Sequence, residues 1–135
     1  MAMTARRVPY FYVTVPDKPG EGVRMLGALR DAGVNLVAFH AFPTGGGQSQ
    51  LDFVPADERA FLEAAKKAKL KVSDRRTVLL LEGEDKPGAV AELLQKLSGT
   101  NVTAIDAVRA GSRYGALLWV KQSDVDKAAK ALGAS

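Results

Sequence analysis

A short motif occurs twice in this chain, and the pattern of residues around it repeats as well. The four residues Asp-Lys-Pro-Gly occupy positions 17–20 and again positions 85–88. Each copy follows an apolar, β-rich segment and precedes an amphipathic run that ends in Gly-x-Asn, at Asn35 and Asn101. The agreement continues beyond the two asparagines, where apolar segments match at the same offset. A repeat of this length predicts one small module used in tandem.

The first half of the first copy predicts a strand followed by a helix. Residues 8–15 are aromatic and β-branched, which favours a strand. Proline lacks an amide hydrogen and has a fixed φ, so Pro19 suits the first turn of a helix. Apolar residues then recur at helical spacing until Gly33 closes the helix. The expected buried stripe consists of Val23, Leu26, Leu29 and Ala32.

The second half of the first copy predicts a hairpin, a helix and a short strand. Residues 36–42 and 48–54 read as two strands around a glycine-rich loop. Asp57 is expected to cap the helix that follows, and residues 69–72 are expected to form the last strand. The buried stripe of that helix is expected to be Phe61, Ala64, Ala65 and Ala68.

The second copy repeats this order but stops early. Strands are expected at residues 77–83, 102–108 and 116–120, with a turn at 111–115. The helix between the first two carries Val90, Leu93, Leu94 and Leu97. Ser123 is expected to cap a last helix that reaches about Leu132. Only three residues remain, fewer than the ~5–6 of a usual strand.

The fold class predicted is therefore α+β, with two tandem ferredoxin-like βαββαβ modules. The modules span residues 8–72 and 77–133, with a linker at 73–76, and both helices of each cover one face of an antiparallel sheet. The second module lacks most of its last strand, which leaves an edge open beside residues 77–83. Either residues 69–72 or a second chain is expected to cover that edge. The first strands are apolar on both faces, so each sheet is expected to meet another sheet, within the chain or across a homodimer.

Composition excludes several classes of protein. The chain has no cysteine, which rules out disulfides, iron–sulfur clusters and thiolate zinc sites and fits a cytoplasmic location. No apolar run approaches the roughly 20 residues of a membrane span. The net charge is +4, with a basic run at residues 66–71 that reads either as a solvated helix face or as a site for an anionic partner. Nucleic acid is the less favoured partner, because nucleic-acid domains show stronger basic patches.

The repeated loops carry the residues best suited to binding. A strand-to-helix junction presents free backbone amides and the positive end of the helix dipole, which favour a carboxylate or phosphate. Glycine at the end of each motif lets a ligand approach the backbone, and each asparagine both donates and accepts hydrogen bonds. Together with the aspartates, these groups match a zwitterion. The competing interpretation is that the aspartates only cap helices and the asparagines only turn the chain.

The pattern strand, Asp-Lys-Pro-Gly, helix, Gly-Val-Asn-Leu, strand resembles the ACT domain, a small ligand-sensing module of amino-acid metabolism. The resemblance covers nearly the whole chain and implies amino-acid binding between the loop of one module and the second strand of a neighbour. Serine-binding members often carry histidine two residues before the aspartate, where this chain has Val15 and Gly83. The ligand-binding residues that the resemblance implies are Asp17, Lys18, Pro19, Gly20, Asn35, Leu36, Asp85, Lys86, Pro87, Gly88, Asn101 and Val102.

No residue pattern indicates an enzyme, a metal site or a cofactor. His40 is the only histidine and stands among apolar residues in an expected strand, and the glycines at 45–47 lie in a hairpin without a phosphate-loop lysine. The first hypothesis is a regulatory protein that binds a small amino acid and modulates a metabolic enzyme.

Two alternatives stay open. One is a subunit that binds an enzyme partner without a ligand. The other is an RRM-like RNA-binding protein, which has the same element order and would stack bases on Tyr10, Tyr12, Phe53 or Trp119. Acidic Asp52 and the absence of a basic third-strand motif count against RNA.

Overall fold

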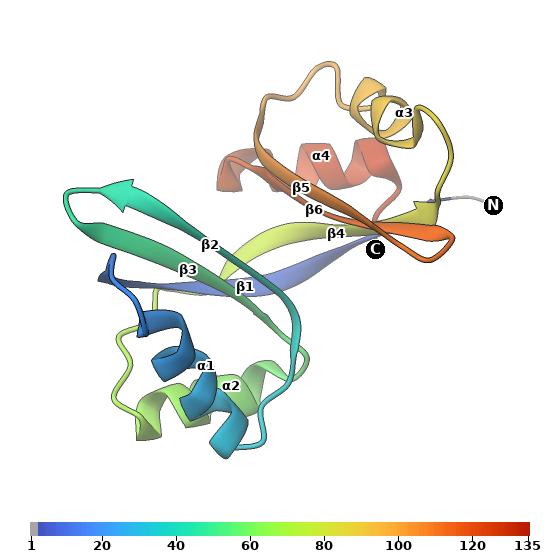
Figure 1. Ribbon diagram of the computed structural model, residues 1–135. Coiled ribbons are helices and arrows are strands. Elements are labelled where there is room, and N and C mark those ends of the chain that lie inside the picture. The colour runs from blue at the N-terminus through green and yellow to red at the C-terminus, as the bar shows by residue number, and fades with distance from the viewer. Residues whose placement is uncertain (1–2) are drawn as a thin grey trace. The chain divides into compact units, whose positions relative to one another are not determined.

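The computed structural model describes residues 3–135 and confirms the α+β class. Within these residues there are six strands and four α-helices, and the hydrogen-bonded strand order is β2-β3-β1-β4-β6-β5. The chain divides into two compact units (Figure 1). The central unit comprises Pro9–Arg76, and the terminal unit comprises Met1–Val8 together with Thr77–Ser135. Strand β3 pairs antiparallel with β1 and β2, and β6 pairs antiparallel with β4 and β5.

The central unit consists of two helices on one face of a three-stranded sheet (Figure 1). Its hydrophobic core gathers aromatic rings from the sheet and from the second helix. Phe61 lies 5.3 Å from Phe11 and 5.5 Å from Phe53, measured between ring centroids. Its elements are β1 (Thr4–Pro16, of which this unit holds the part from Pro9), α1 (Glu21–Asp31), β2 (Leu36–Gly45), β3 (Gln48–Pro55) and α2 (Glu58–Lys67).

The first helix buries a different stripe from the expected one. Met25 and Leu29, four residues apart, are the buried residues of α1, whereas Val23 is 77% exposed. Ala32 is the exposed C-cap residue. Residues at i and i+4 share a helix face, so the choice of Met25 as the contact to the sheet turns Val23 toward solvent. The prediction for Val23 and Ala32 was wrong.

The terminal unit repeats the order strand, helix, strand, strand, helix. Its core combines residues of β4, β6, α3 and α4, among them Leu81 and Leu118, which have no exposed surface. Helices α3 and α4 cover one face of its sheet (Figure 1). Its elements are β4 (Arg76–Glu84), α3 (Ala89–Gln95), β5 (Val102–Ala110), β6 (Arg113–Val120), a 3₁₀ turn (Gln122–Asp124) and α4 (Val125–Leu132).

Two boundaries in this unit differ from the prediction. Ser123 does not cap the last helix, because it lies in the 3₁₀ turn and α4 begins two residues later. The side chain of Gln122 fixes this turn through two hydrogen bonds with the backbone of Thr77, at 2.9 and 3.0 Å. The hairpin between β5 and β6 is also tighter than expected, and Gly115 pairs with Val108 inside the sheet.

Residues 69–72 do not form the predicted strand. Lys69 has a left-handed conformation, with φ 59°, and it ends α2 with hydrogen bonds from Lys69 N to Lys66 O (3.1 Å) and from Leu70 N to Ala65 O (2.8 Å). This helix ending redirects the chain, and only Ser73 bonds to β1, through the backbone of Tyr12. Leu70 and Val72 still pack on the central core.

The first strand begins earlier than predicted and supplies the missing edge of the terminal unit. β1 starts at Thr4 rather than at Val8, and β4 is its neighbour in the strand order. The last residue also pairs with this segment, because Ser135 N donates to Ala5 O (3.3 Å) and Arg7 N donates to Ser135 O (3.1 Å). The edge beside β4 is therefore covered by the chain's own first residues, neither by residues 69–72 nor by a second chain.

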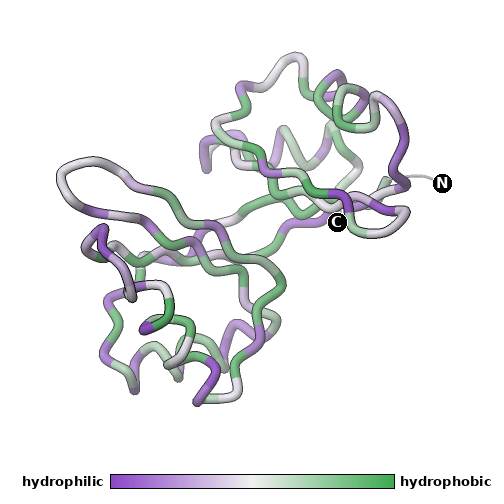
Figure 2. The backbone as a smooth tube through the Cα atoms, in the orientation of Figure 1, coloured by the Kyte–Doolittle hydropathy of each residue, from purple (hydrophilic) through white to green (hydrophobic). Residues whose placement is uncertain are grey.

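Burial on both faces was expected for the first strand of each module, and adjacent residues are buried in both, Tyr10 with Phe11 in β1 and Val78 with Leu79 in β4. Five consecutive residues are also buried in β3, at 51–55, and five in β6, at 116–120. Successive strand residues point to opposite faces, so these strands are covered on both sides. Figure 2 shows hydrophobic residues along the strands of both units. No helix within residues 3–135 has the length and apolar character needed to cross a membrane.

Candidate functional site

The first Asp-Lys-Pro-Gly loop is an exposed turn between β1 and α1. It is tied to the neighbouring hairpin by a hydrogen bond from Asp17 N to Gly47 O (2.9 Å), and Lys18 N donates to Pro16 O (3.0 Å). Gly20 is the N-cap residue, with φ 94°, and no side chain of the described chain caps the helix. A Cβ at Gly20 would meet no atom within 4 Å, so the left-handed backbone conformation is what requires glycine.

The second loop is built in the same way. Asp85 N donates to Ser112 O (3.0 Å) at the tip of the other hairpin, and Gly88 is the N-cap residue of α3, with φ 80°. Neither aspartate caps a helix with its side chain. The interpretation of Asp17 and Asp85 as helix caps is therefore wrong, and their carboxylates remain at the surface.

Charged side chains surround the two loops differently. In the central unit, Glu21 Oε1 lies 2.7 Å from Arg24 Nη2, and this hydrogen bond lowers the pKa of the Glu21 carboxyl and raises the pKa of Arg24. In the terminal unit, Arg109 Nε lies 3.3 Å from Asp85 Oδ2 and also donates to Gly111 O (3.0 Å). A carboxylate lies in the first turn of both helices, Glu21 in α1 and Glu92 in α3, and the second loop differs in having an arginine beside its aspartate.

The asparagines lie at the far ends of the helices that follow the loops. Helix α1 has eleven residues and is about 16 Å long, and it separates the first loop from Asn35. The backbone oxygen of Asn35 accepts a hydrogen bond from Ala56 N (3.0 Å), and its side chain is exposed. Within one unit the structure therefore does not bring loop and asparagine together. The remaining predicted residues are exposed at Pro19, Lys86, Pro87 and Asn101 and half-buried at Leu36 and Val102.

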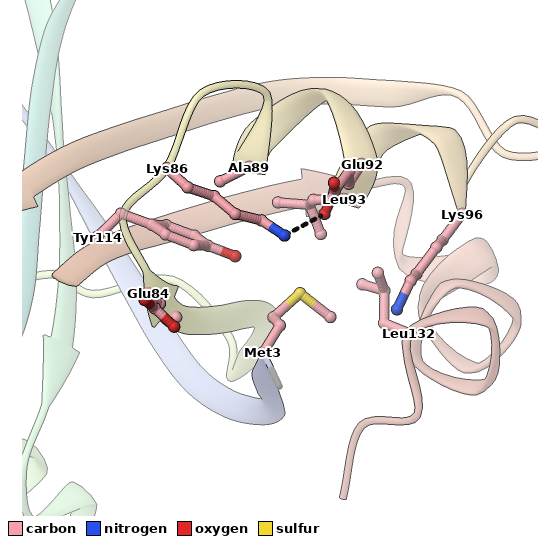
Figure 3. Close-up of a pocket in the computed structure, with 10 residues that line it drawn as sticks. Met3, Glu84, Lys86, Ala89, Glu92, Leu93, Lys96, Tyr114 and Leu132 are labelled. Atoms are coloured by element: carbon pink, nitrogen blue, oxygen red, sulfur yellow. Dashed lines mark ion pairs between the residues drawn. The ribbon is translucent and has the colours of Figure 1, made fainter. Parts of the chain in front are cut away.

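The structure adds a pocket that the sequence did not indicate. It has a volume of about 250 Å³ and lies in the terminal unit between α3, α4 and the start of β1 (Figure 3). Lys86 is the only predicted ligand-binding residue that lines it. Burial, and then the nearby Glu92 carboxylate, raise the pKa of Tyr114 in its wall. One sign of the pocket was visible in the sequence, because the second copy has the small residue Gly83 where the first copy has Val15.

The only histidine and the acidic residues do not form a metal site. His40 lies in β2 with its ring 4.9 Å from that of Phe42, and its register partner in β3 is Asp52. Among residues 3–135, no group of three histidine, aspartate or glutamate side chains could hold a metal ion.

Comparisons with known proteins identify the fold. No known family pattern and no curated protein matches the sequence. Among solved structures, a protein of Bacteroides thetaiotaomicron is similar with a TM-score of 0.83 and 18% identity, over 96% of this chain and 88% of that one. The ligand-free regulatory subunit of aspartate kinase from Thermus thermophilus is similar with a TM-score of 0.65 and 15% identity, over 98% of this chain and 95% of that one.

The regulatory subunit of aspartate kinase from Thermus flavus is similar in structure to about the same degree. Its TM-score is 0.66 and its identity is 16%, over 98% of this chain and 95% of that one. These neighbours are regulatory subunits and not catalytic ones. The chain therefore shares the fold of aspartate kinase regulatory subunits over nearly its whole length.

Proposed function

We propose that this protein is a small ACT-type regulatory protein, without catalytic activity, that binds a small amino acid and modulates a metabolic enzyme in the cytoplasm. The observation that carries the proposal is the extent of the structural match. Regulatory subunits of aspartate kinase align with 98% of this chain and are themselves covered to 95%.

The repeated loops support the binding part of the proposal. Each loop leaves the first amides of a helix unpaired by any capping side chain in the described residues, and each carries an exposed aspartate. Amides of this kind donate hydrogen bonds to a carboxylate, and an aspartate accepts hydrogen bonds from an ammonium group. A free amino acid carries both groups on one carbon.

The separation of each loop from its asparagine supports the proposal that the ligand binds where two modules meet. A ligand that touches both Asp17 and an asparagine has to bridge two modules, because α1 holds the groups of one module about 16 Å apart. We therefore place the amino acid at a contact between modules, either of one chain or of two chains in a homodimer. Binding there favours the assembled state over the separate one, and such a preference is what a regulatory signal requires.

A thermal-shift screen of the purified protein against each standard amino acid at millimolar concentration tests this function. A ligand at about a hundred times its dissociation constant stabilises the native state by about 2.7 kcal/mol, which shifts the midpoint by several degrees. We expect one amino acid or a small chemical class to act. The shift should fall in Asp17→Ala and Asn35→Ala if the first loop is used, and in Asp85→Ala and Asn101→Ala if the second is used.

Asp74→Ala is the matched control, because Asp74 is an exposed carboxylate on the segment between α2 and β4, away from both motifs. It should leave the ligand-induced shift unchanged. A flat response to every amino acid would overturn the binding proposal.

A partner-binding subunit without a ligand is the second candidate. One observation favours it: the Glu21 carboxylate already occupies the first turn of α1 and pairs with Arg24, which leaves less positive potential for a ligand carboxylate. Co-purification of an enzyme together with a flat amino-acid screen would support this candidate.

Burial of the aromatic residues counts against RNA binding. Of the four that would stack on bases, Tyr10, Phe53 and Trp119 are 6%, 0% and 7% exposed, and Tyr12 is half-buried. Bases need exposed ring faces to stack.

A further inference from the structure

The excess positive charge of the chain is concentrated in one segment. Residues 58–76 include seven basic and three acidic residues, so their net charge of +4 equals that of the whole chain. The rest of the chain is therefore balanced between the two signs. The segment consists of α2 and the connection up to the first residue of β4, and it belongs to the central unit alone. A local excess of this kind attracts a partner of negative charge.

The excess charge is carried by lysines that have no carboxylate partner. Arg75 Nε lies 2.8 Å from Glu58 Oε2, and Arg59 Nε lies 3.3 Å from Glu63 Oε1. These ion pairs use both glutamates of the segment. Four exposed lysines follow, and none of them makes an ion pair with a residue from 3 to 135. They are Lys66, Lys67, Lys69 and Lys71.

The packing of this segment keeps all four lysines at the surface. Leu70 and Val72 are half-buried and pack on the hydrophobic core of the central unit, whereas the lysines beside them, Lys69 and Lys71, are exposed. The two lysines in the last turn of α2 lie outside the buried stripe of that helix. The four ammonium groups therefore face solvent around one end of α2.

The ending of the helix does not require so many lysines. α4 ends with the same two backbone hydrogen bonds, with Lys130 as the basic residue of its last turn and Gly133 at the left-handed position. α2 has Lys69 at that position, with φ 59°, although glycine adopts this conformation at lower cost. The helix dipole favours cations in the last turn, which accounts for lysines within α2 but not for Lys69 and Lys71 beyond it. A strained lysine at this place indicates that its charge has a use.

We propose that these four lysines form a docking surface for an acidic segment of a partner protein. Lysine ammonium groups are flexible point charges, so they suit several carboxylates without a fixed geometry, and charge complementarity of this kind steers association. The surface goes beyond the proposed function, because it needs neither an amino acid nor a contact between modules. It defines the chemistry of the partner as a run of aspartate and glutamate side chains.

The other residues of the segment disfavour other polyanions. Proteins hold single-stranded nucleic acid with aromatic rings that stack on bases, and the only aromatic residue between positions 58 and 76 is Phe61, which is 0% exposed. An amphipathic helix binds a membrane through its apolar face, and the apolar face of α2 packs on the core. Phosphate groups favour arginine forks, and all three arginines of the segment are bonded to other side chains.

Fluorescence anisotropy with a labelled oligoglutamate peptide tests the surface on the full chain. We expect saturable binding that weakens at least about tenfold when the salt concentration rises from about 0.02 to 0.2 M, because salt screens exposed charges. An oligoglutamine peptide of the same length should not bind. Absence of binding to oligoglutamate, or binding that salt does not weaken, would overturn the proposal.

Two charge-matched variants locate the surface. The first triple variant removes three charges from it and should weaken peptide binding about tenfold or more, whereas the second removes three exposed charges from the terminal unit and should change binding by about twofold or less. Both are compared at about 0.1 M salt, where charges more than roughly 10 Å away are screened. Equal losses in the two would mean that only the net charge matters, which would overturn the surface. The variants are Lys67→Gln/Lys69→Gly/Lys71→Gln and Lys96→Gln/Lys121→Gln/Lys130→Gln.

Lys69→Gly separates loss of charge from loss of folding. Glycine relieves the left-handed strain, so this variant should be at least as stable as the parent and still bind the peptide about twofold to threefold more weakly. Unchanged peptide binding in Lys69→Gly would remove this lysine from the surface and overturn the argument from its strain.

Two further probes test the class of partner. If an oligouridine RNA or phosphatidylserine vesicles bound more tightly than the peptide, and lost binding in the first triple variant, the acidic protein partner would be overturned. Peptide binding that the first triple variant weakens, together with a flat amino-acid screen, would support this surface while the amino-acid part of the proposed function fails.

Discussion

The two units carry the same loop on the same turn, yet they differ in what surrounds it. Asp17 and Asp85 make equivalent backbone hydrogen bonds to a hairpin tip, and Gly20 and Gly88 are both left-handed. The surroundings differ in the strand pair beside the loop, which is Val15–Ser49 in the central unit and Gly83–Tyr114 in the terminal unit.

In the central unit the larger residue of this pair, Val15, lies on the first strand and its partner Ser49 is small. In the terminal unit the first strand has Gly83, and the larger residue, Tyr114, lies on the partner strand. Backbone geometry is kept by the repeated motif, whereas the space beside it is set by residues that the motif does not include. The comparison indicates that the two loops are alike as structures and unlike as binding sites.

The first strand makes the largest difference between the units. The central unit uses β1 from Pro9 onward, and the terminal unit depends on the first residues of the chain, including Met3 and Ala5, which pack on its core. Removing residues 1–7 should destabilise the terminal unit by roughly 4 kcal/mol, since it loses this packing and exposes the edge of β4. Amide hydrogen exchange should show the loss in β4 and β6, with a much smaller change in β2 and β3.

Removal of residues 133–135 is the matched control, because it takes away the bonds of Ser135 to Ala5 and Arg7, the C-cap of α4 and the packing of Ala134, but leaves Met3 and Ala5 on the core. It should cost less than the N-terminal truncation. Equal protection in β4 before and after removal of residues 1–7 would contradict the dependence.

A substitution in the pair of Gly83 and Tyr114 should give the next largest effect. Gly83→Val restores the residue of the first copy but places a Cβ 2.8 Å from the ring of Tyr114, so we expect a loss of about 2 kcal/mol in urea unfolding. In a Tyr114→Ser background the same change should cost nothing or stabilise, because the ring is gone. Additive costs in this double-mutant cycle would show that the two residues do not compete for space.

Local patterns predicted much of the fold. Strands, hairpins and both loops came from alternation, glycine and proline, because these signals act over a few residues. The buried stripe of α1 was misassigned because both Val23 and Met25 are apolar and the sequence does not say which face meets the sheet.

Contacts between residues far apart in the chain could not be predicted. The segment before Val8 has neither clear alternation nor a nearby partner, and its place beside β4 follows only from the folded sheet. The pocket depends on the register of Gly83 with Tyr114 and on Met3, which are also distant in sequence. The separation of Asp17 from Asn35, in contrast, follows from helix length alone and was predictable.

The ends of the second helices offer a smaller test of the comparison. α4 ends at Gly133, with φ 66°, whereas α2 places Lys69 in the same left-handed region, with φ 59°. Lys69→Gly should stabilise the central unit by about 0.5–1 kcal/mol, and Gly133→Ala should destabilise the terminal unit by about 1 kcal/mol. Urea unfolding measures both. A loss of stability in Lys69→Gly would mean that contacts of the lysine side chain outweigh the backbone strain.

The smallest expected effect concerns the first turn of α1. Arg24 lowers the pKa of Glu21 through a 2.7 Å hydrogen bond. The residue of the terminal unit that is equivalent to Arg24 is Glu92, which pairs with Lys86. Arg24→Ala should raise the pKa of Glu21 toward its ordinary value of 4.5, measured by NMR titration of the side-chain carboxyl. A carboxyl with a lowered pKa stabilises the fold above its ordinary pKa, and this contribution is lost as the pH falls through the lowered value.

The stability difference between the parent and Arg24→Ala should therefore be present at neutral pH and vanish in acid. Arg24→Lys is the matched control, because it keeps the charge and loses the guanidinium geometry, so it should shift the pKa of Glu21 less. An unchanged Glu21 pKa in Arg24→Ala would point to Lys18, whose charge also lowers it. In that case the lysine of the motif would lower the pKa of the carboxyl in the first turn of α1. The two units would then be more alike, because Lys86 of the second motif also pairs with a carboxylate, that of Glu92.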